Sequence, residues 1–139
     1  MPIREPAVPV LGGESLDFGD RRQIDAALAT AKRFSDLDFQ AYLGPAGDDP
    51  REHARALHSR LTRPEVSVLV LCDPEARALE IVTGQATRQY LDDAACRLAV
   101  ATMTSSFLAG DLVGGLVRGI QQLGEAAHHP KTLHAANIV

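Results

Sequence analysis

A run of seven residues near the middle of the chain restricts the folds that this sequence can adopt. The run from Val66 to Cys72 reads Val-Ser-Val-Leu-Val-Leu-Cys. A nearly continuous, valine-rich run of this length is typical of a β-strand that is covered on both faces. Asp73-Pro74 then supplies the residues preferred at the first two positions of a type I turn. From Arg77 to Thr83, side chains alternate between two faces as in a returning strand, and Gly84 ends this strand. The sequence therefore predicts a central strand in an antiparallel hairpin.

Four amphipathic stretches around these strands predict helices. The first is expected to begin at Asp20, because Asp20 and Gln23 have the spacing of a capping box. The second is expected after Asp49, which can cap a helix that starts with proline. The third is expected from Tyr90 or Asp92 to Leu108, and the fourth after Gly110-Asp111. The expected buried positions are Ile24, Ala27, Leu28 and Ala31 in the first helix, Ala54, Leu57, His58 and Leu61 in the second, and Val113, Leu116, Val117, Ile120 and Leu123 in the fourth.

The order of these elements predicts the fold class. A further strand, Asp38 to Leu43, precedes the second helix, so this strand, the helix and the central strand form a parallel crossover unit. We expect an α/β fold, a three-layer α/β/α sandwich around a small mixed sheet. Residues 20–128 form the predicted domain, residues 1–19 an arm with a short edge strand at 7–11, and residues 129–139 a tail.

Charge and composition exclude several classes of protein. The chain has 139 residues, with 14 lysines and arginines against 18 acidic residues, for a net charge of −4. A general nucleic-acid binder is not expected, because its affinity depends on neutralising phosphates. No run approaches the roughly 18 apolar residues of a membrane span, so direct membrane insertion is not expected either. Without a signal peptide or a disulfide framework, we expect a cytoplasmic protein.

The aspartates offer two alternative pockets at opposite edges of the sheet. One lies at the carboxyl end of the central strand, where open α/β sheets commonly bind ligands. The other follows the returning strand. Each aspartate also has a simpler interpretation as a helix cap (Asp49, Asp92 or Asp93, Asp111) or as the start of a turn (Asp73). The first set comprises Asp48, Asp49 and Asp73; the second comprises Thr83, Gly84, Thr87, Asp92 and Asp93.

Other reactive side chains have structural interpretations. His58 falls on the apolar stripe of its helix and is expected to be a packed, hydrogen-bonded residue. Cys72 and Cys96 are expected to be inert buried thiols. The spacing of Gly110 with Gly114, and of Gly115 with Gly119, would let another backbone approach the fourth helix. No motif for a cofactor is present, and none is expected.

Several segments resemble an uncharacterised actinobacterial domain family across residues 20–128. They are Phe39-Gln40-Ala41-Tyr42-Leu43-Gly44, the hairpin from Val68 to Arg77, Leu79-Glu80-Ile81-Val82-Thr83-Gly84, and Phe107-Leu108-Ala109-Gly110-Asp111-Leu112.

The order of elements is also similar to the TPM domain of thylakoid lumen, photosystem II repair and receptor-modulator proteins. That resemblance implies a TPM-like fold and either assembly, calcium binding or acid phosphatase activity, with Ca²⁺ or Mg²⁺ as the cation of a phosphatase and Asp92 and Asp93 as weak candidate ligands. The chain departs from the TPM pattern at Thr83-Gly84-Gln85-Ala86-Thr87, which lacks the second glycine and the acidic residue after the hairpin.

Two functions follow from these observations. The first is a non-enzymatic interaction or assembly module that binds a protein partner or a second copy of itself, because no catalytic constellation is apparent and the last two helices carry few charges. The alternative is a weak metal-assisted acid phosphatase of the TPM type.

Overall fold

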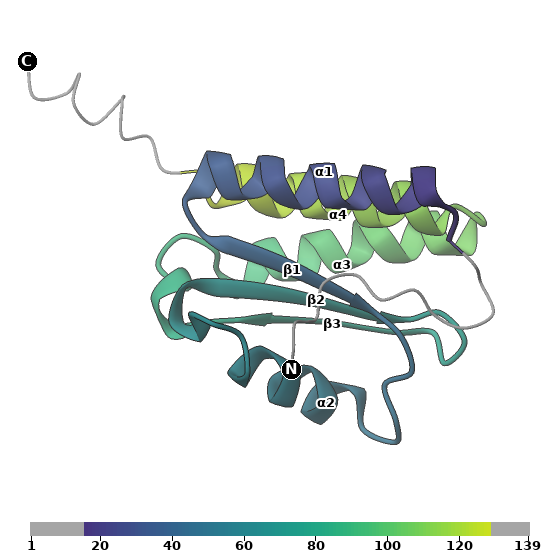
Figure 1. The fold of residues 1–139 in the computed structure, drawn as a ribbon, viewed down its shortest axis with the longest axis horizontal. Helices are drawn as coiled ribbons and strands as arrows, with labels where there is room; N and C mark the ends of the chain where they lie inside the picture. The colour runs from purple at the N-terminus through teal and green to yellow at the C-terminus, as the bar shows by residue number, and fades with distance from the viewer. Residues whose placement is uncertain (1–15, 129–139) are drawn as a thin grey trace, which may run out of the picture.

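The computed structural model describes residues 16–128 and contains the predicted order of helices and strands (Figure 1). Two short 3₁₀ turns, η1 and η2, flank the hairpin strands. The elements are α1 (Phe18–Ser35), β1 (Asp38–Leu43), α2 (Pro50–Ser59), η1 (Pro64–Val66), β2 (Ser67–Asp73), β3 (Ala78–Thr83), η2 (Gln85–Thr87), α3 (Asp93–Leu108) and α4 (Leu112–Ala126).

The three strands form one mixed sheet in the order β1-β2-β3. Strand β1 is parallel to β2, with Asp38 opposite Ser67, and β3 is antiparallel to β2, with Ile81 opposite Val70. Every residue of β2 is buried. The prediction of a central strand covered on both faces is therefore confirmed, and within residues 16–128 β1 and β3 are the outer strands of the sheet.

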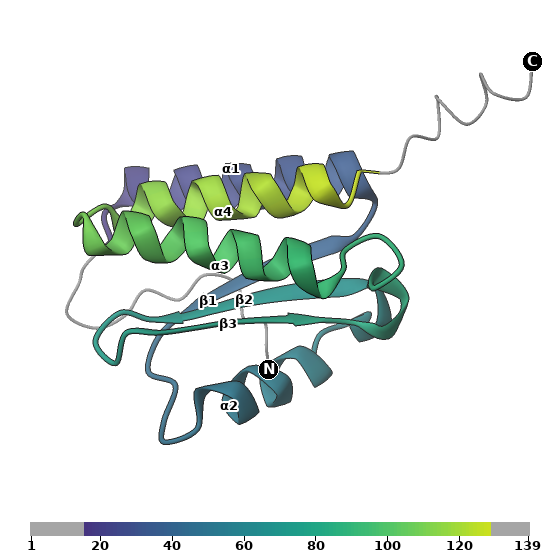
Figure 2. The ribbon, with the colours of Figure 1, turned by 180° about the vertical axis from the view of Figure 1, so that it is seen from behind.

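Helices cover both faces of the sheet, as the predicted three-layer α/β/α fold requires (Figures 1 and 2). Helix α2 packs on one face against β2 and β3. The other three helices lie on the opposite face, with α4 in contact with both α1 and α3. Two hydrophobic clusters fill the spaces between layers, a large one on the three-helix side and a small one under α2.

Helix α1 begins earlier than the sequence predicted. Asp17 is the N-cap: its carboxylate accepts a 2.8 Å hydrogen bond from the Asp20 amide, and the Asp20 carboxylate accepts one from the Asp17 amide. The prediction that Asp20 begins the helix is therefore wrong, because Asp20 occupies the third helical position of a reciprocal capping box. The predicted strand at 7–11 and the tail at 129–139 lie outside the described residues.

The other helix starts follow the predicted caps. The side chains of Asp49, Asp92 and Asp111 each accept a hydrogen bond from the amide three residues later, at 3.1, 2.9 and 2.9 Å. Asp92, rather than Tyr90 or Asp93, caps α3. These carboxylates satisfy amides that the first turn of a helix leaves without intrahelical partners.

The returning strand of the hairpin begins at Ala78, one residue later than predicted. Asp73 still belongs to β2 and pairs with Ala78, so four residues form the connection. Arg77 lies inside this connection with a φ of 56°. The prediction that Arg77 starts the returning strand is wrong, because a left-handed backbone at this position turns the chain into β3.

Small residues on α4 allow close packing within the chain itself. A Cβ atom on Gly115 would meet Ser106 and Phe107 of α3, and one on Gly124 would meet the Cα and Cβ of Ala31 in α1. At Gly115, one of the glycines identified by its spacing in the sequence, the neighbouring space is thus filled by side chains of α3. No helix in residues 16–128 combines the length and apolar character that crossing a membrane requires.

The contact between α4 and α1 predicts opposite effects for two helical glycines. Gly124→Ala should lower the free energy of unfolding by about 1–3 kcal/mol, because the added methyl group overlaps Ala31 backbone atoms. Gly19→Ala meets only ordinary contacts and should raise it by up to about 1 kcal/mol through helix propensity. Urea denaturation of both variants measures the difference. Equal stabilisation by both substitutions would contradict the close packing.

Candidate functional site

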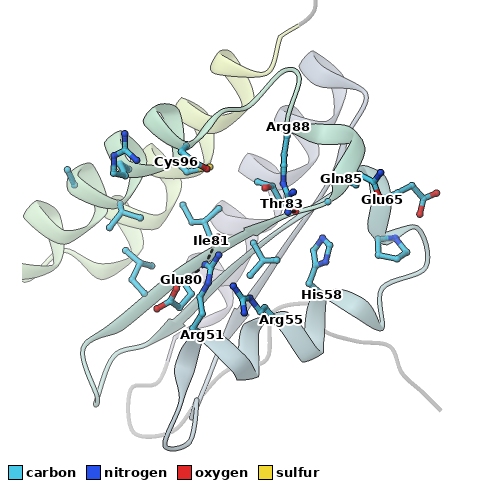
Figure 3. A pocket seen from close by; sticks show the side chains of 18 residues that line it. Arg51, Arg55, His58, Glu65, Glu80, Ile81, Thr83, Gln85, Arg88 and Cys96 are labelled. Carbon is cyan, nitrogen blue, oxygen red and sulfur yellow. Dashed lines mark hydrogen bonds and ion pairs between the residues drawn. The ribbon is translucent and has the colours of Figure 1, made fainter.

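An open groove runs along the free edge of β3, between α2 and α3 (Figure 3). Its volume is about 1140 Å³. Helix α2 contributes one wall, the first half of α3 the other, and residues 79–83 of β3 lie between them. The turn from Pro64 to Glu65 and the segment from Gly84 to Arg88 border the groove at the end where β3 stops.

The charged residues of this groove are mainly arginines. Four arginines face three carboxylates, those of Glu65, Glu80 and Asp93, although the whole chain carries a net charge of −4. Arg55 and Arg97 form no ion pair or side-chain hydrogen bond within the described residues. The groove is thus a locally positive site on an acidic protein. The four arginines are Arg51, Arg55, Arg88 and Arg97.

Arg51 lies directly against the edge strand. Its Nη1 donates one hydrogen bond to the Glu80 carboxylate and one to the Ile81 carbonyl oxygen, both at 3.1 Å. Arg88 approaches the Thr83 carbonyl oxygen at 3.5 Å. Figure 3 shows Arg51 and Arg88 reaching β3 from opposite ends of the groove. The guanidinium groups therefore cover carbonyl oxygens that the sheet leaves unpaired.

Three residues of the second predicted set line this groove, namely Thr83, Gly84 and Asp93. Gly84 has a structural reason to be glycine, since a Cβ atom there would collide with the backbone carbonyl groups of Pro64 and Glu65. Thr87 is fully buried, and its hydroxyl donates a 2.7 Å hydrogen bond to the Gly84 carbonyl oxygen. Asp92 is engaged as the cap of α3.

The first predicted set lies at the other end of the strands, where β1 and β2 stop, and its members belong to loops and a helix cap. The buried carboxylate of Asp73 accepts hydrogen bonds from the Ala46 amide at 2.9 Å and the Ala76 amide at 3.2 Å. The loop after β1 thus meets the carboxyl end of β2, as predicted. However, Asp49 caps α2, and Asp48 is exposed. Asp73 therefore joins two loops, and it also borders a smaller cavity of about 450 Å³ beside Phe107 and Leu108.

His58 and Cys72 are buried as predicted, whereas Cys96 is only half-buried and lines the groove. The ring of His58 is buried and its Nε2 lies 2.9 Å from the Ser67 carbonyl oxygen, to which it donates. Burial raises the pKa of the Cys72 thiol to about 12, and the charge of Asp73 adds to this effect. Burial also raises the pKa of Cys96, which is half-buried on the α3 wall. Neither thiol is prepared as a nucleophile, since nucleophilic cysteines have lowered pKa values.

The acidic residues do not gather into a cation site in the part of the chain that the structure describes. Within residues 16–128, no three side chains of His, Cys, Asp or Glu are close enough together to hold a metal ion. Asp111, the remaining cap, is exposed, and its hydrogen bonds from the Gly114 amide and Arg118 lower its pKa. Its carboxylate is occupied with the start of α4.

The arginines are the residues that sequence reasoning missed. Arg51 and Arg55 are four residues apart and so share one face of α2, which is a signal that the sequence does contain. Arg97 comes from α3 and Arg88 from the connection before it. Only the packing of α2 and α3 on either side of β3 brings the four together.

Comparison with known protein families shows to which family the chain belongs. A family described as a domain of unknown function (DUF5130) matches residues 13–124. The chain belongs to this family. The uncharacterised proteins Rv2468c and MT2543 of two Mycobacterium tuberculosis strains are each 34% identical to it over 106 residues, which cover 76% of this chain. The chain spans 64% of the length of these relatives.

Solved structures share the fold of this DUF5130 domain. The BA42 protein of Bizionia argentinensis superposes with a TM-score of 0.73 at 18% identity, covering 82% of each chain. The N-terminal domain of the cg2496 protein of Corynebacterium glutamicum has a TM-score of 0.67 at 16% identity, covering 81% of this chain and 74% of that one. The N-terminal domain of a protein from P. gingivalis has a TM-score of 0.67 at 20% identity, covering 82% of this chain and 81% of that one. At these identities the likeness establishes the α/β fold.

The hydrogen bonds of Asp73 predict a stabilising role. Asp73→Ala should lower the free energy of unfolding by about 1–3 kcal/mol, because it leaves the buried Ala46 amide without an acceptor. Asp48→Ala, in the same loop region but exposed, should change it by less than about 0.5 kcal/mol. Urea denaturation at neutral pH measures both. Equal effects would show that the Asp73 carboxylate is not anchoring the loop.

Proposed function

We propose that this DUF5130 domain is a non-enzymatic binding module whose groove beside β3 holds an acidic segment of a partner protein. The observation that carries the proposal is the set of arginines in the groove, two of which lack a partner within the described residues. Arginine is well suited to this role, because its planar guanidinium group can donate two parallel hydrogen bonds to a carboxylate. A positive groove on a net negative chain also favours acidic partners during encounter.

The positions of the reactive groups support binding rather than catalysis. In the described part of the chain, the caps Asp49, Asp92 and Asp111 and the turn residue Asp73 have structural hydrogen bonds. The buried His58 ring is bonded to a backbone carbonyl group. No pair of a nucleophile and an activating base therefore lies in the groove.

The alternative function is the weak metal-assisted acid phosphatase that the TPM resemblance implies. One observation favours it: an arginine-rich groove that also contains Asp93 would attract a phosphate group. Asp92, the neighbouring candidate ligand, is bonded to the Ala95 amide. A phosphatase of this kind would need Ca²⁺ or Mg²⁺ held by further oxygen ligands, and the described residues provide no such group around Asp93.

Binding of an acidic peptide tests the proposed function. The probe is acetyl-Glu-Val-Glu-Val-Glu-Val-Glu-amide, titrated into the full chain by isothermal titration calorimetry at low salt. The double variant Arg55→Gln, Arg97→Gln should bind it about tenfold more weakly, since each exposed ion pair contributes up to about 1 kcal/mol. Affinity should also fall as salt is added.

A variant with the same change of net charge provides the control. Arg21→Gln, Arg33→Gln removes two exposed arginines of α1, outside the groove, and should bind the peptide like the unmodified protein. An equal loss in both double variants would mean that only net charge matters. Either that result or an unmodified protein that does not bind the peptide would overturn the proposed function.

The phosphatase alternative predicts a different result. We expect no hydrolysis of p-nitrophenyl phosphate at acid pH, with or without Ca²⁺ or Mg²⁺, because the carboxylates do not converge. The comparison is between the unmodified protein and Asp92→Asn, Asp93→Asn. Metal-dependent activity that is lost in this double variant would replace the binding proposal with the phosphatase.

A further inference from the structure

The direction of the backbone groups of β3 determines what the groove can hold. The Gly84 amide donates to the Ser67 carbonyl oxygen. In this antiparallel register, the even-numbered residues of β3 therefore direct their backbone amide and carbonyl groups toward β2. Leu79, Ile81 and Thr83 must then direct their amide and carbonyl groups away from the sheet. The Arg51 bond to the Ile81 carbonyl oxygen agrees with this direction. The groove therefore has a row of outward backbone donors and acceptors between its walls.

The two walls of the groove differ in chemistry. On the α2 side, the side chains beside β3 are those of Arg51 and Arg55, with the Glu80 carboxylate already paired to Arg51. On the α3 side, Cys96 and Val100 line the groove together with Leu79, and all three are half-buried apolar side chains. The exposed side chains of Arg97 and Asp93 also belong to the α3 wall. An extended chain laid along β3 would point alternate side chains toward these two walls.

We propose that the partner segment binds as a fourth strand on β3, with acidic side chains toward α2 at every second position and apolar side chains toward α3. This inference rests on the proposed function and specifies how the acidic segment is held. Its carboxylates fit Arg51 and Arg55, its apolar side chains fit the α3 wall, and its backbone pairs with the outward groups of β3. Strand addition of this kind takes affinity from main-chain hydrogen bonds and specificity from alternate side chains.

Arg51 has a second role in this binding mode. Its guanidinium group now occupies the Ile81 carbonyl oxygen, which an added strand needs as an acceptor. An incoming carboxylate provides the guanidinium group with a new partner and so frees that oxygen for an amide of the segment. Exchange of one hydrogen bond for another keeps every buried polar group satisfied.

N-methylation of the peptide distinguishes strand addition from attraction by charge. Two versions of acetyl-Glu-Val-Glu-Val-Glu-Val-Glu-amide carry three N-methyl groups each, one version on the valine amides and the other on three of the glutamate amides. Both keep the same charge. In an added strand, amides of one parity face β3 and those of the other face solvent. One methylated peptide should therefore bind about tenfold or more weakly, because it loses several hydrogen bonds, while the other binds like the parent.

The identity of the weaker peptide also reports the strand direction. Weak binding of the valine-methylated peptide indicates an antiparallel strand. In that arrangement, the residues hydrogen-bonded directly opposite Leu79 and Ile81 have their side chains on the same α3-facing side, so these residues are the valines. Weak binding of the glutamate-methylated peptide indicates a parallel strand. Equal binding of the two methylated peptides, whether strong or weak, would overturn strand addition. If the parent peptide still binds through Arg55 and Arg97, the proposed function remains.

The remaining candidate to occupy the groove is a second copy of the chain, paired edge to edge at β3. Sedimentation of the protein without peptide tests this alternative. We expect a monomer whose sedimentation is unchanged by Arg55→Gln, Arg97→Gln. A dimer that the parent peptide dissociates would overturn the inference, because β3 would then be the contact between two copies.

Discussion

Burial of β2 on both faces is the constraint on which the rest of this structure depends. Val68, Val70 and Cys72 join the large cluster under α1, α3 and α4, while Leu69 and Leu71 join the small cluster under α2. Each face of the strand is too apolar to be left in water, since burying one such side chain is worth about 1.5–3 kcal/mol. Helices on both sides are the means by which this strand is covered.

The same arrangement explains where a site can form. The described part of the chain contributes three strands to the sheet, so β1 and β3 are its outer strands and each is paired with the central strand β2. Helices α2 and α3 cover the two faces at β3, and the edge between them remains open. The groove is thus a consequence of covering a narrow sheet from both sides.

Much of the fold follows from local signals in the sequence. The apolar run of β2, the caps at Asp49 and Asp111 and the alternation of β3 each depend on neighbouring residues, and the structure contains them as predicted. The start of α1 was misplaced because Asp17 and Asp20 both fit a capping pattern and only the backbone distinguishes them. Arg77 lies in the hairpin loop, whereas the sequence predicted it in β3. The Asp-Pro pair does not distinguish the two cases, because both two-residue and four-residue hairpin loops can begin with proline after an aspartate.

The candidate site was much harder to predict than the fold. Sequence reasoning identified Thr83, Gly84 and Asp93, which do lie in the groove, but considered mainly acidic residues. The basic residues come from α2, from the segment after β3 and from α3, and more than thirty residues separate Arg55 from Arg88. The spacing of Arg51 and Arg55 indicates a shared helix face, but the approach of Arg88 and Arg97 to that face results from tertiary packing.

The contact of Arg51 with Ile81 has a consequence for the concentrated protein in solution. Exposed edge strands are templates on which identical chains can stack into fibrils, and charged side chains at the edge are a common protection. Here the guanidinium group occupies a carbonyl oxygen that such stacking would need. A domain with this arrangement can keep an accessible edge and still resist aggregation.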